Sequence, residues 1–246
     1  MSADYSRKFE MSSKNRHKLV PQDPNDEPAS VLLEKIKAEK AELIKQGKIK
    51  KDKQESRIYK GADNRYYEQI GTETKDITNE IPFDIPNSWE WVRLGSVFNI
   101  ILGQSPDGNS VNNKKGIEFH QGKVFFGSKY LRQSNQYTTN PSKLVQKGTV
   151  LLCVRAPVGV VNITKRNICI GRGLAGIANI LGISTDFIYY WLQVYKNEFI
   201  SKATGTTFIA ITGDVIQNQL IPLPPLLEQN RIVQKITKML EVISVL

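Results

Sequence analysis

Residues 149–176, TVLLCVRAPVGVVNITKRNICIGRGLAG, contain three short apolar runs separated by turn-forming residues. The runs at 149–154, 160–163 and 167–170 are rich in Val, Ile and Leu, which fit the half-buried surface of a sheet. The Pro, Gly and Asn residues between them are typical of turns. The pattern predicts three consecutive short strands, and therefore a strand-rich fold at the centre of the chain.

Similar patterns continue on both sides of this stretch. Apolar runs at 97–102 and 123–126 predict two further strands. Residues 185–199 instead repeat apolar side chains at helical spacing, with Ser184 or Thr185 as the N-cap, and predict one helix. We therefore expect a mixed α/β fold, α+β-like in character, in which helices flank a strand-rich domain.

The chain before residue 81 differs in composition from the strand-rich part. A helix is expected to begin near Pro28 and to end at Gly47, because apolar residues between them recur with a 3.6-residue period. Residues 61–80 are polar and predict an irregular linker. The expected segments are a flexible lead-in at 1–25, a spacer helix and basic linker at 26–80, a strand-rich domain at 81–223 and a coiled-coil helix at 224–246.

Apolar residues recur at alternating spacings of four and three near the C-terminus. They are Ile232, Ile236, Met239, Ile243 and Leu246. This is the a/d pattern of a coiled coil, and so narrow a stripe calls for a partner helix. The alternative is that the stripe packs on the first helix or on the strand-rich domain of the same chain.

The positive charge of the chain is unevenly distributed. Of 246 residues, 34 are Lys or Arg and 24 are Asp or Glu, which gives a net charge of +10. Residues 81–246 contribute +8, with 17 basic and 9 acidic side chains. Between Phe119 and Thr185 there are nine Lys and Arg and no Asp or Glu. A field of one sign favours nucleic acid as the partner, the alternative being a soluble domain that is merely basic.

Few residues of the usual catalytic and metal-binding types are present. The only histidines are His17 and His120, and the only cysteines, Cys153 and Cys169, are expected to be buried and reduced. The sequence has no P-loop spacing. GRGLAG at 171–176 fits G-x-G-x-x-G, but the next acid, Asp186, follows Gly176 by only ten residues and the surroundings are rich in strands. This favours a tight bend over a nucleotide site. We predict no catalytic residue and no metal site in this chain.

Residue types suited to DNA binding gather in three loops. Lys and Arg contact phosphates, whereas Arg, Asn, Gln, Ser and Thr read base edges. The loops at 102–110, 127–136 and 203–208 combine these types. Arg155 and Arg172 lie beside apolar strands, so their alternative is hydrogen bonding to buried carbonyl groups. The predicted DNA-binding residues are Gln104, Ser105, Lys114, Lys115, Lys129, Tyr130, Arg132, Gln133, Arg155, Lys165, Arg166, Arg172, Thr206 and Thr207.

Five stretches of the sequence point to one family. They are KLVPQDPNDEPASVLLE at 18–34, IPFDIPNSWEWVRLG at 81–95, VRAPVG at 154–159, GRGLA at 171–175 and IPLPPLLEQNRIVQKI at 221–236. Together these stretches resemble the DNA-specificity (S) subunit of type I restriction–modification systems, and the first and last are the most specific. A complete S subunit has two target-recognition domains and two long helices. This chain resembles a half-length form with one such domain.

The resemblance implies a non-enzymatic subunit whose target-recognition domain, at 81–223, binds double-stranded DNA. It implies modification (M) subunits, which methylate adenine, and restriction (R) subunits as partners, with the helices forming a coiled-coil spacer. S-adenosylmethionine, ATP and magnesium are then expected on those partners, and no cofactor on this chain. A homodimer through the coiled-coil helix would restore two recognition domains and would predict a palindromic, interrupted site.

Two other functions compete with this hypothesis. One is a truncated or silent half-subunit that docks to the M subunit without reading DNA. The other is a stand-alone DNA methyltransferase or nuclease, against which the scarcity of acids in the central segment counts. The polar N-terminus and the absence of an apolar run of ~18 residues predict a cytoplasmic protein with no membrane contact.

Overall fold

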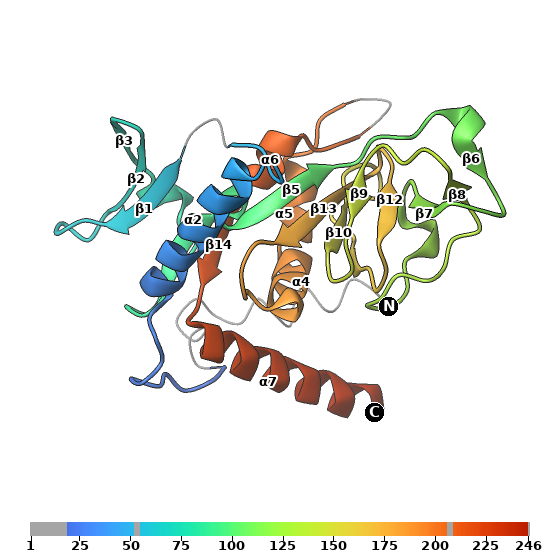
Figure 1. Cartoon of the computed structure of the whole chain (residues 1–246). Coiled ribbons are helices and arrows are strands. Elements are labelled where there is room, and N and C mark those ends of the chain that lie inside the picture. Colours follow the sequence, from blue (N-terminus) through green and yellow to red (C-terminus); the bar gives the residue numbers. More distant parts are fainter. Residues whose placement is uncertain (1–18, 52–54, 206–208, 246) are drawn as a thin grey trace. The chain divides into compact units, whose positions relative to one another are not determined.

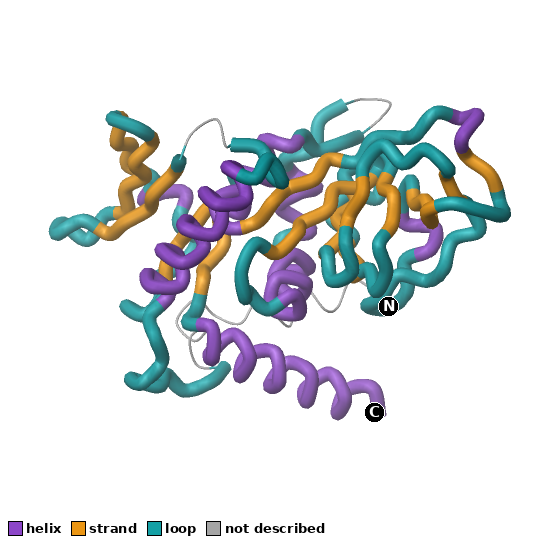
Figure 2. Tube along the Cα trace, in the orientation of Figure 1, coloured by secondary structure: helices purple, strands orange, loops and turns teal. Residues whose placement is uncertain are grey.

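The computed structural model describes residues 19–51, 55–205 and 209–245, and the chain folds into two compact units (Figure 1). Unit 1 comprises the residues up to Val97, residues 180–187 and the residues from Leu220 on. Unit 2 comprises residues 98–179 and 188–219. Both units contain helices and strands (Figure 2), which confirms the predicted mixed α/β class. Unit 1 is assembled from three separate stretches, so the units differ from the four consecutive segments expected above.

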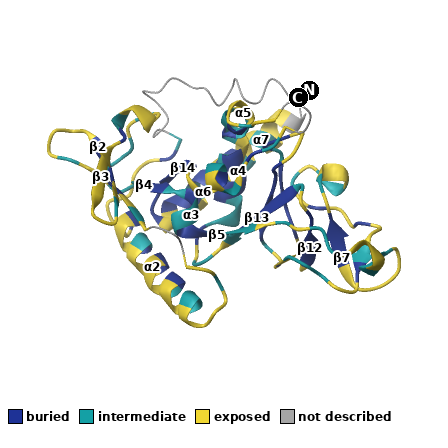
Figure 3. Cartoon of the chain, turned by 90° about the horizontal axis from the view of Figure 1, so that it is seen from above, coloured by how far each residue is buried: buried dark blue, intermediate teal, exposed yellow. Residues whose placement is uncertain are grey.

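The first described helix of unit 1, α2 (Ala29–Lys45), matches its prediction closely. Pro28 is the N-cap, and Ala29, Leu32 and Ile36 are buried on one side of the helix, while much of the rest is exposed (Figure 3). The helix ends where Gly47, with a φ of +69°, donates its N–H to the carbonyl of Ile44 at 2.9 Å. A left-handed glycine after the last turn is the usual way to end a helix.

Residues 19–26 are held on unit 1 by specific contacts. Val20 is buried, and Ser88 donates a hydrogen bond of 2.8 Å to the Gln22 side chain. Asp26 accepts a hydrogen bond of 3.2 Å from Arg231, on the C-terminal helix. These contacts fix residues 19–25, which were predicted to belong to a flexible lead-in, whereas residues 1–18 lie outside the described part of the chain.

Residues 56–76 form an antiparallel three-stranded sheet where the sequence predicted a basic, largely irregular linker. The strands are β1 (Ser56–Lys60), β2 (Tyr66–Ile70) and β3 (Glu73–Asp76). Ile58 and Tyr66 are buried in a cluster with Trp91, and the guanidinium of Arg93 contacts Glu68 at 2.6 Å. The prediction was wrong because these strands are mostly polar. Their few inward side chains are stabilised by partners far away in the sequence.

The other elements of unit 1 lie near its core or at its C-terminal end. A 3-10 helix, η2 (Thr78–Glu80), precedes β4 (Glu90–Arg93), which pairs antiparallel with β14 (Leu220–Leu223). The short helix α3 (Leu94–Val97) follows β4 directly. The last helix, α7 (Leu226–Val245), begins immediately after Pro224 and Pro225.

Unit 2 contains two sheets. The four-stranded antiparallel sheet has the order β11 (Val161–Ile163), β10 (Val150–Cys153), β13 (Leu174–Asn179) and β5 (Phe98–Leu102). The five-stranded sheet has the order β6 (Val111–Asn112), β8 (Tyr137–Thr138), β7 (Ile117–His120), β12 (Ile168–Ile170) and β9 (Leu144–Val145). In the second sheet β7 and β12 run parallel, and the other described pairs run antiparallel.

One apolar core joins the two sheets of unit 2. Leu151 and Leu174 of the first sheet cluster with Val145, Ile168 and Ile170 of the second, and all five are almost fully buried. Strands β7 and β12 are accordingly dark blue over most of their length in Figure 3. The strands predicted at 97–102, 149–154, 160–163 and 167–170 are therefore confirmed.

Two local predictions in unit 2 need correction. Residues 123–125 form a 3-10 helix, η4 (Lys123–Phe125), rather than a strand, and its Val124 side chain is 74% exposed. The helix predicted at 185–199 is two helices, α4 (Thr185–Val194) and α5 (Lys196–Ser201). The backbone leaves the helical range at Tyr195, and Phe199 of α5 is completely buried. The remaining short elements are η3 (Gly108–Ser110) and α6 (Gly213–Gln217).

Glycines allow backbone segments to meet closely at the turn between β12 and β13. A Cβ atom on Gly173 would lie 2.3 Å from the carbonyl oxygen of Gln121, and one on Gly103 would lie 2.1 Å from that of Gly171. No side chain fits at either distance, so these positions require glycine. This geometry confirms the tight bend that the glycine motif predicted.

The two cysteines agree with the expectation from the sequence. Cys153 and Cys169 are both buried and unbonded to each other. Among the described helices, none is both long enough and apolar enough to cross a membrane.

Candidate nucleic-acid interface

Two basic segments of unit 2 lie side by side although about 30 residues separate them in sequence. Tyr130 forms a parallel bridge with Ile163, the last residue of β11. Ile163 donates its N–H to the carbonyl of Lys129 at 2.9 Å, and Leu131 donates to the carbonyl of Ile163 at 2.9 Å. This pairing brings the predicted loop at 127–136 next to residues 163–166, both of which carry candidate DNA-binding side chains.

Cations and aromatic rings alternate where these segments meet. The Nζ atom of Lys165 lies 3.8 Å from the centre of the Tyr130 ring. The Nζ atom of Lys129 lies 5.5 Å from the same ring and 5.1 Å from that of Tyr190. Cation–π contacts at such distances contribute about 0.5–1 kcal/mol each at exposed sites. We call the group Lys129, Tyr130, Arg132, Lys165 and Tyr190 the basic–aromatic surface.

The helix α4 supplies an aromatic support for this surface. Tyr189 is buried and donates its hydroxyl to the carbonyl of Ser128 at 2.9 Å, and its ring centre lies 5.3 Å from that of Tyr190. Lys129 lies 5.7 Å from the Tyr189 ring. Tyr189 and Tyr190 were not among the predicted DNA-binding residues. The signal was present as two adjacent tyrosines on a helix, but their proximity to Lys129 comes from the tertiary fold.

The buried carboxylate of Glu118 holds the loop at 127–136 in place. Glu118 accepts hydrogen bonds from Arg166 Nε at 2.6 Å and from the backbone N–H of Ser134 at 2.7 Å, and lies 2.9 Å from Nε2 of His120. Desolvation raises the pKa of Glu118, but these hydrogen bonds outweigh it and lower the pKa to about 2. Desolvation also lowers the pKa of His120, which favours its neutral form.

Arg166 therefore has a structural partner, and its role as a DNA-binding residue stays a prediction. Its Nη2 atom also donates to Glu118 at 2.8 Å and to the carbonyl of Arg132 at 3.3 Å. The acidic partner escaped the sequence analysis because Glu118 immediately precedes the acid-free segment. Arg132 and Gln133 are exposed on the same loop, where Arg132 donates to the carbonyl of Val124 at 3.2 Å and Gln133 to the hydroxyl of Tyr137 at 3.0 Å.

The remaining predicted residues lie outside the basic–aromatic surface. Gln104 is exposed but tied through its backbone, since its N–H donates to Ile170 at 3.0 Å, and the Ser105 hydroxyl is buried. Lys114 and Lys115 are exposed between β6 and β7, where both backbone N–H groups donate to the Asn112 side chain.

Arg155 and Arg172 are exposed at the ends of strands, which argues against the alternative of buried arginines bonded to carbonyls. Arg155 follows β10 and forms an antiparallel bridge with Ala210, and Arg172 lies in the turn between β12 and β13. Ala210 also bridges to Thr204, whereas Thr206 and Thr207 lie outside the described residues.

The positive charge of the chain belongs almost entirely to unit 2. The sequence of unit 2 contains 13 Lys and Arg but four Asp and Glu, a net charge of +9, whereas the rest of the chain has 21 and 20. In the described part of unit 2, Lys114, Lys115, Lys165 and Arg172 have no carboxylate within ion-pair distance. A unit with this excess attracts polyanions over much of its surface.

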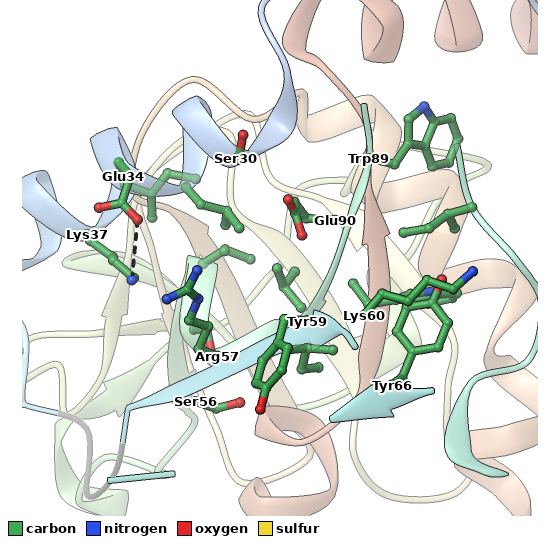
Figure 4. A pocket seen from close by; sticks show the side chains of 18 of the residues that line it. Ser30, Glu34, Lys37, Ser56, Arg57, Tyr59, Lys60, Tyr66, Trp89 and Glu90 are labelled. Atoms are coloured by element: carbon green, nitrogen blue, oxygen red, sulfur yellow. Dashed lines mark hydrogen bonds and ion pairs between the residues drawn. The ribbon is translucent and has the colours of Figure 1, made fainter. Parts of the chain in front are cut away.

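A cavity in the described part of unit 1 has a volume of about 420 Å³ and lies between α2, β1 and β4 (Figure 4). Its lining includes Ser30 of α2, Tyr59 of β1 and Glu90 of β4. Burial raises the pKa of Glu90, and the charge of Arg57 opposes that shift. The described residues contain no group of three or more His, Cys, Asp or Glu side chains that could hold a metal ion.

Comparison with known proteins identifies the family. Residues 86–244 match the model of the type I restriction modification DNA specificity domain. The chain belongs to this family. The match begins in unit 1, spans the whole of unit 2 and extends into α7, so it includes both the basic–aromatic surface and most of the C-terminal helix.

Three similar proteins illustrate the relationship. The putative type I restriction enzyme MjaX specificity subunit of Methanocaldococcus jannaschii is 35% identical, over 94% of this chain and 54% of the relative. The EcoAI specificity subunit of Escherichia coli is 31% identical, over 92% of this chain and 37% of the relative. The solved HsdS subunit of Thermoanaerobacter tengcongensis is 37% identical, with a TM-score of 0.61, over 67% of this chain and 40% of that chain.

The chain therefore spans about half the length of the first of these relatives and less of the others. A further structure comes from work on complex assembly and conformational transition of the type I R-M system. It is 38% identical, with a TM-score of 0.61, and the match covers 67% of this chain and 41% of that chain.

Proposed function

We propose that the chain is one half of a non-catalytic DNA-specificity subunit, in which unit 2 binds one half of a bipartite target site. The observation that carries this proposal is the placement of nearly all the net positive charge on unit 2, together with the exposed Tyr130 ring and Lys165 of the basic–aromatic surface. Cations would fix the position of the duplex on phosphates, while exposed polar side chains of the loops would read base edges.

Family membership supports a role inside a larger assembly. M and R subunits are the proposed partners, and S-adenosylmethionine, ATP and magnesium would be bound by them rather than by this chain. Methylation requires the target adenine to leave the base stack, and that step would belong to the M subunit. A partner of this kind would place the protein in the cytoplasm together with the DNA.

The exposed half of α7 supports a second contact, in the form of a coiled-coil spacer. Ile232 and Ile236 are buried, whereas Met239 and Ile243 are 45% and 39% exposed. Leu246, the last residue of the predicted stripe, lies outside the described residues. The exposed end of the stripe would pair with a helix of an M subunit or of a second copy of this chain. A second copy would make the recognised site palindromic.

The decisive experiment measures affinity for duplex DNA against salt concentration. If several Lys and Arg contact phosphates, the logarithm of the affinity should fall linearly with the logarithm of salt, with a slope of about −0.9 for each contact. A flat dependence between roughly 50 and 200 mM salt would exclude phosphate contact.

Sequence-specific recognition needs a second measurement in cells. Methylated adenines should be mapped with and without this chain, in the presence of the M subunit. Methylation at one interrupted sequence that disappears with the chain is the expected result. Co-purification with M but without DNA binding or a change in methylation would instead support the docking half-subunit.

A further inference from the structure

A small cavity lies in unit 2 where three separate stretches of chain meet. Its volume is about 160 Å³. The residues that matter to the argument are Gln121, Gly122, Lys123, Cys153, Arg155 and Gly173. They come from the β7–η4 connection, the end of β10 and the β12–β13 turn. The cavity therefore belongs to a junction that the two sheets build together.

Backbone contacts fix this junction. Gly171 donates its N–H to the carbonyl of His120 at 2.8 Å, and Val154 donates to the carbonyl of Gly173 at 3.0 Å. Gly173 passes so close to Gln121 that no side chain fits between them. A Cβ atom on Gly122 would meet nothing within 4 Å, so the backbone there is open to a ligand. The walls are thus preorganised, and one of them leaves the main chain accessible.

The charge at this cavity is entirely positive. Lys123 and Arg155 are exposed, and neither has a carboxylate within ion-pair distance among the described residues. The other titratable group of the lining is Cys153, which is buried, and burial raises its pKa to about 12. The thiol is therefore neutral at physiological pH and adds no negative charge that would oppose an anion.

We propose that this cavity binds one phosphate group of the DNA backbone, held between Lys123 and Arg155. The inference rests on the proposed function and assigns one specific phosphate contact to it. Two cations beside an accessible glycine backbone can bind the oxygen atoms of a phosphate group. The residues named above include no aromatic ring on which a base could stack.

Hydrogen bonds also connect one wall of the cavity to the loop of the basic–aromatic surface. Arg132 donates its backbone N–H to Phe125 at 2.8 Å and its guanidinium to the carbonyl of Val124 at 3.2 Å. The η4 helix that carries Lys123 is therefore attached to the loop that carries Lys129 and Tyr130. A DNA phosphate bound at the cavity would fix the position of the DNA strand that continues toward the basic–aromatic surface.

The test compares the salt dependence of DNA binding between the wild type and variants in which a cation of the cavity is replaced by a neutral side chain. Lys123→Gln and Arg155→Gln should each make the slope less steep by about 0.9, and the double variant by about 1.8. Lys202→Gln is the matched control, since Lys202 lies in unit 2 but is paired with Glu198 at 2.6 Å. The control should keep the slope of the natural chain.

Arg155→Lys separates loss of charge from loss of folding. It retains the cation and should preserve most of the slope, even if Arg155→Gln disturbs the loop. Wild-type binding that depends on salt, combined with an unchanged slope in the double variant, would overturn the cavity proposal and leave the proposed function intact. No DNA binding by the wild type would overturn both.

Free phosphate is the other possible source of the same ligand chemistry. Inorganic phosphate added at constant ionic strength should weakly compete with DNA for the wild type and not for the double variant. Tight binding of inorganic phosphate with no effect of the double substitution on DNA affinity would assign the cavity to a free anion and overturn the proposal.

Discussion

The Nζ atom of Lys165 lies 3.8 Å from the centre of the Tyr130 ring, on two loops joined by the bridge between Tyr130 and Ile163. Tyr130 remains 39% exposed despite this contact. The lysine therefore holds an aromatic side chain in place without covering it. In the proposed complex, this arrangement would present both a positive charge and an aromatic face to the duplex at one position.

Lys165→Gln and Tyr130→Ala should weaken DNA binding in different ways. The lysine change should make the salt slope less steep by about 0.9, because one phosphate contact is lost. The tyrosine change removes no charge, so affinity should fall several-fold at every salt concentration while the slope stays constant. Fluorescence anisotropy with a labelled duplex measures both effects.

The control for this pair is Lys75→Gln on β3. Lys75 is an exposed lysine of unit 1 that pairs with Glu80 at 2.8 Å. Its replacement by Gln lowers the net charge by one, as the replacement of Lys165 does. An equal change of slope in Lys75→Gln would mean that overall charge, rather than the basic–aromatic surface, sets the salt dependence.

Glu118→Gln should destabilise the folded chain by about 3 kcal/mol, because it leaves Arg166 and the Ser134 N–H without their buried anionic partner. The effect should depend on pH. The folded-state pKa of Glu118 is about 2, below its ordinary value of 4.5, so its contribution is fully present above pH 4.5 and is lost as the pH falls toward 2. Urea unfolding at several pH values measures it.

Glu198→Gln is the comparison for that substitution. Glu198 forms an exposed i,i+4 pair with Lys202, which contributes only about 0.3–0.5 kcal/mol. If both variants lost the same stability, or if Glu118→Gln kept the acid dependence of the natural chain, the buried network would not be what fixes the loop.

The sequence was sufficient for those features that depend on local pattern. The apolar runs between residues 149 and 170 became β10, β11 and β12, and the glycines after them became the predicted tight bend. The charge asymmetry was also visible, because the central segment lacks acids. Each of these properties can be predicted from residues that are neighbours in the sequence, without knowledge of the tertiary structure.

Features that arise from distant partners were not predictable in the same way. The β1–β3 sheet was predicted as a polar linker because the charge of the buried Glu68 is paired with Arg93, which follows 25 residues later. Tyr189 and Tyr190 join Lys129 across about 60 residues. The ion pair of Arg166 with Glu118 was not predicted, because Glu118 precedes the acid-free run by one position.

Gly173→Ala should destabilise unit 2 by about 1–3 kcal/mol, because the new methyl group would lie 2.3 Å from the Gln121 carbonyl oxygen and the backbone would have to move. Gly108→Ala is the control, since its Cβ would meet nothing within 4 Å. Thermal unfolding of the full chain should show a lower midpoint for the first variant and an unchanged or slightly higher one for the second. Equal midpoints would contradict the close approach.

Substitutions in the two halves of the α7 stripe should differ in their effect on the unfolding free energy. Ile236 is buried, so Ile236→Ala should cost about 2–4 kcal/mol of stability. Ile243 is 39% exposed, so Ile243→Lys should leave the unfolding free energy nearly unchanged. If α7 pairs with a helix of another chain, Ile243→Lys should nevertheless weaken self-association or binding of the M subunit, because a charge would enter an apolar seam. Sedimentation velocity with and without M measures this. A lysine at this position that changes neither assembly would argue that the stripe has no partner beyond its own unit.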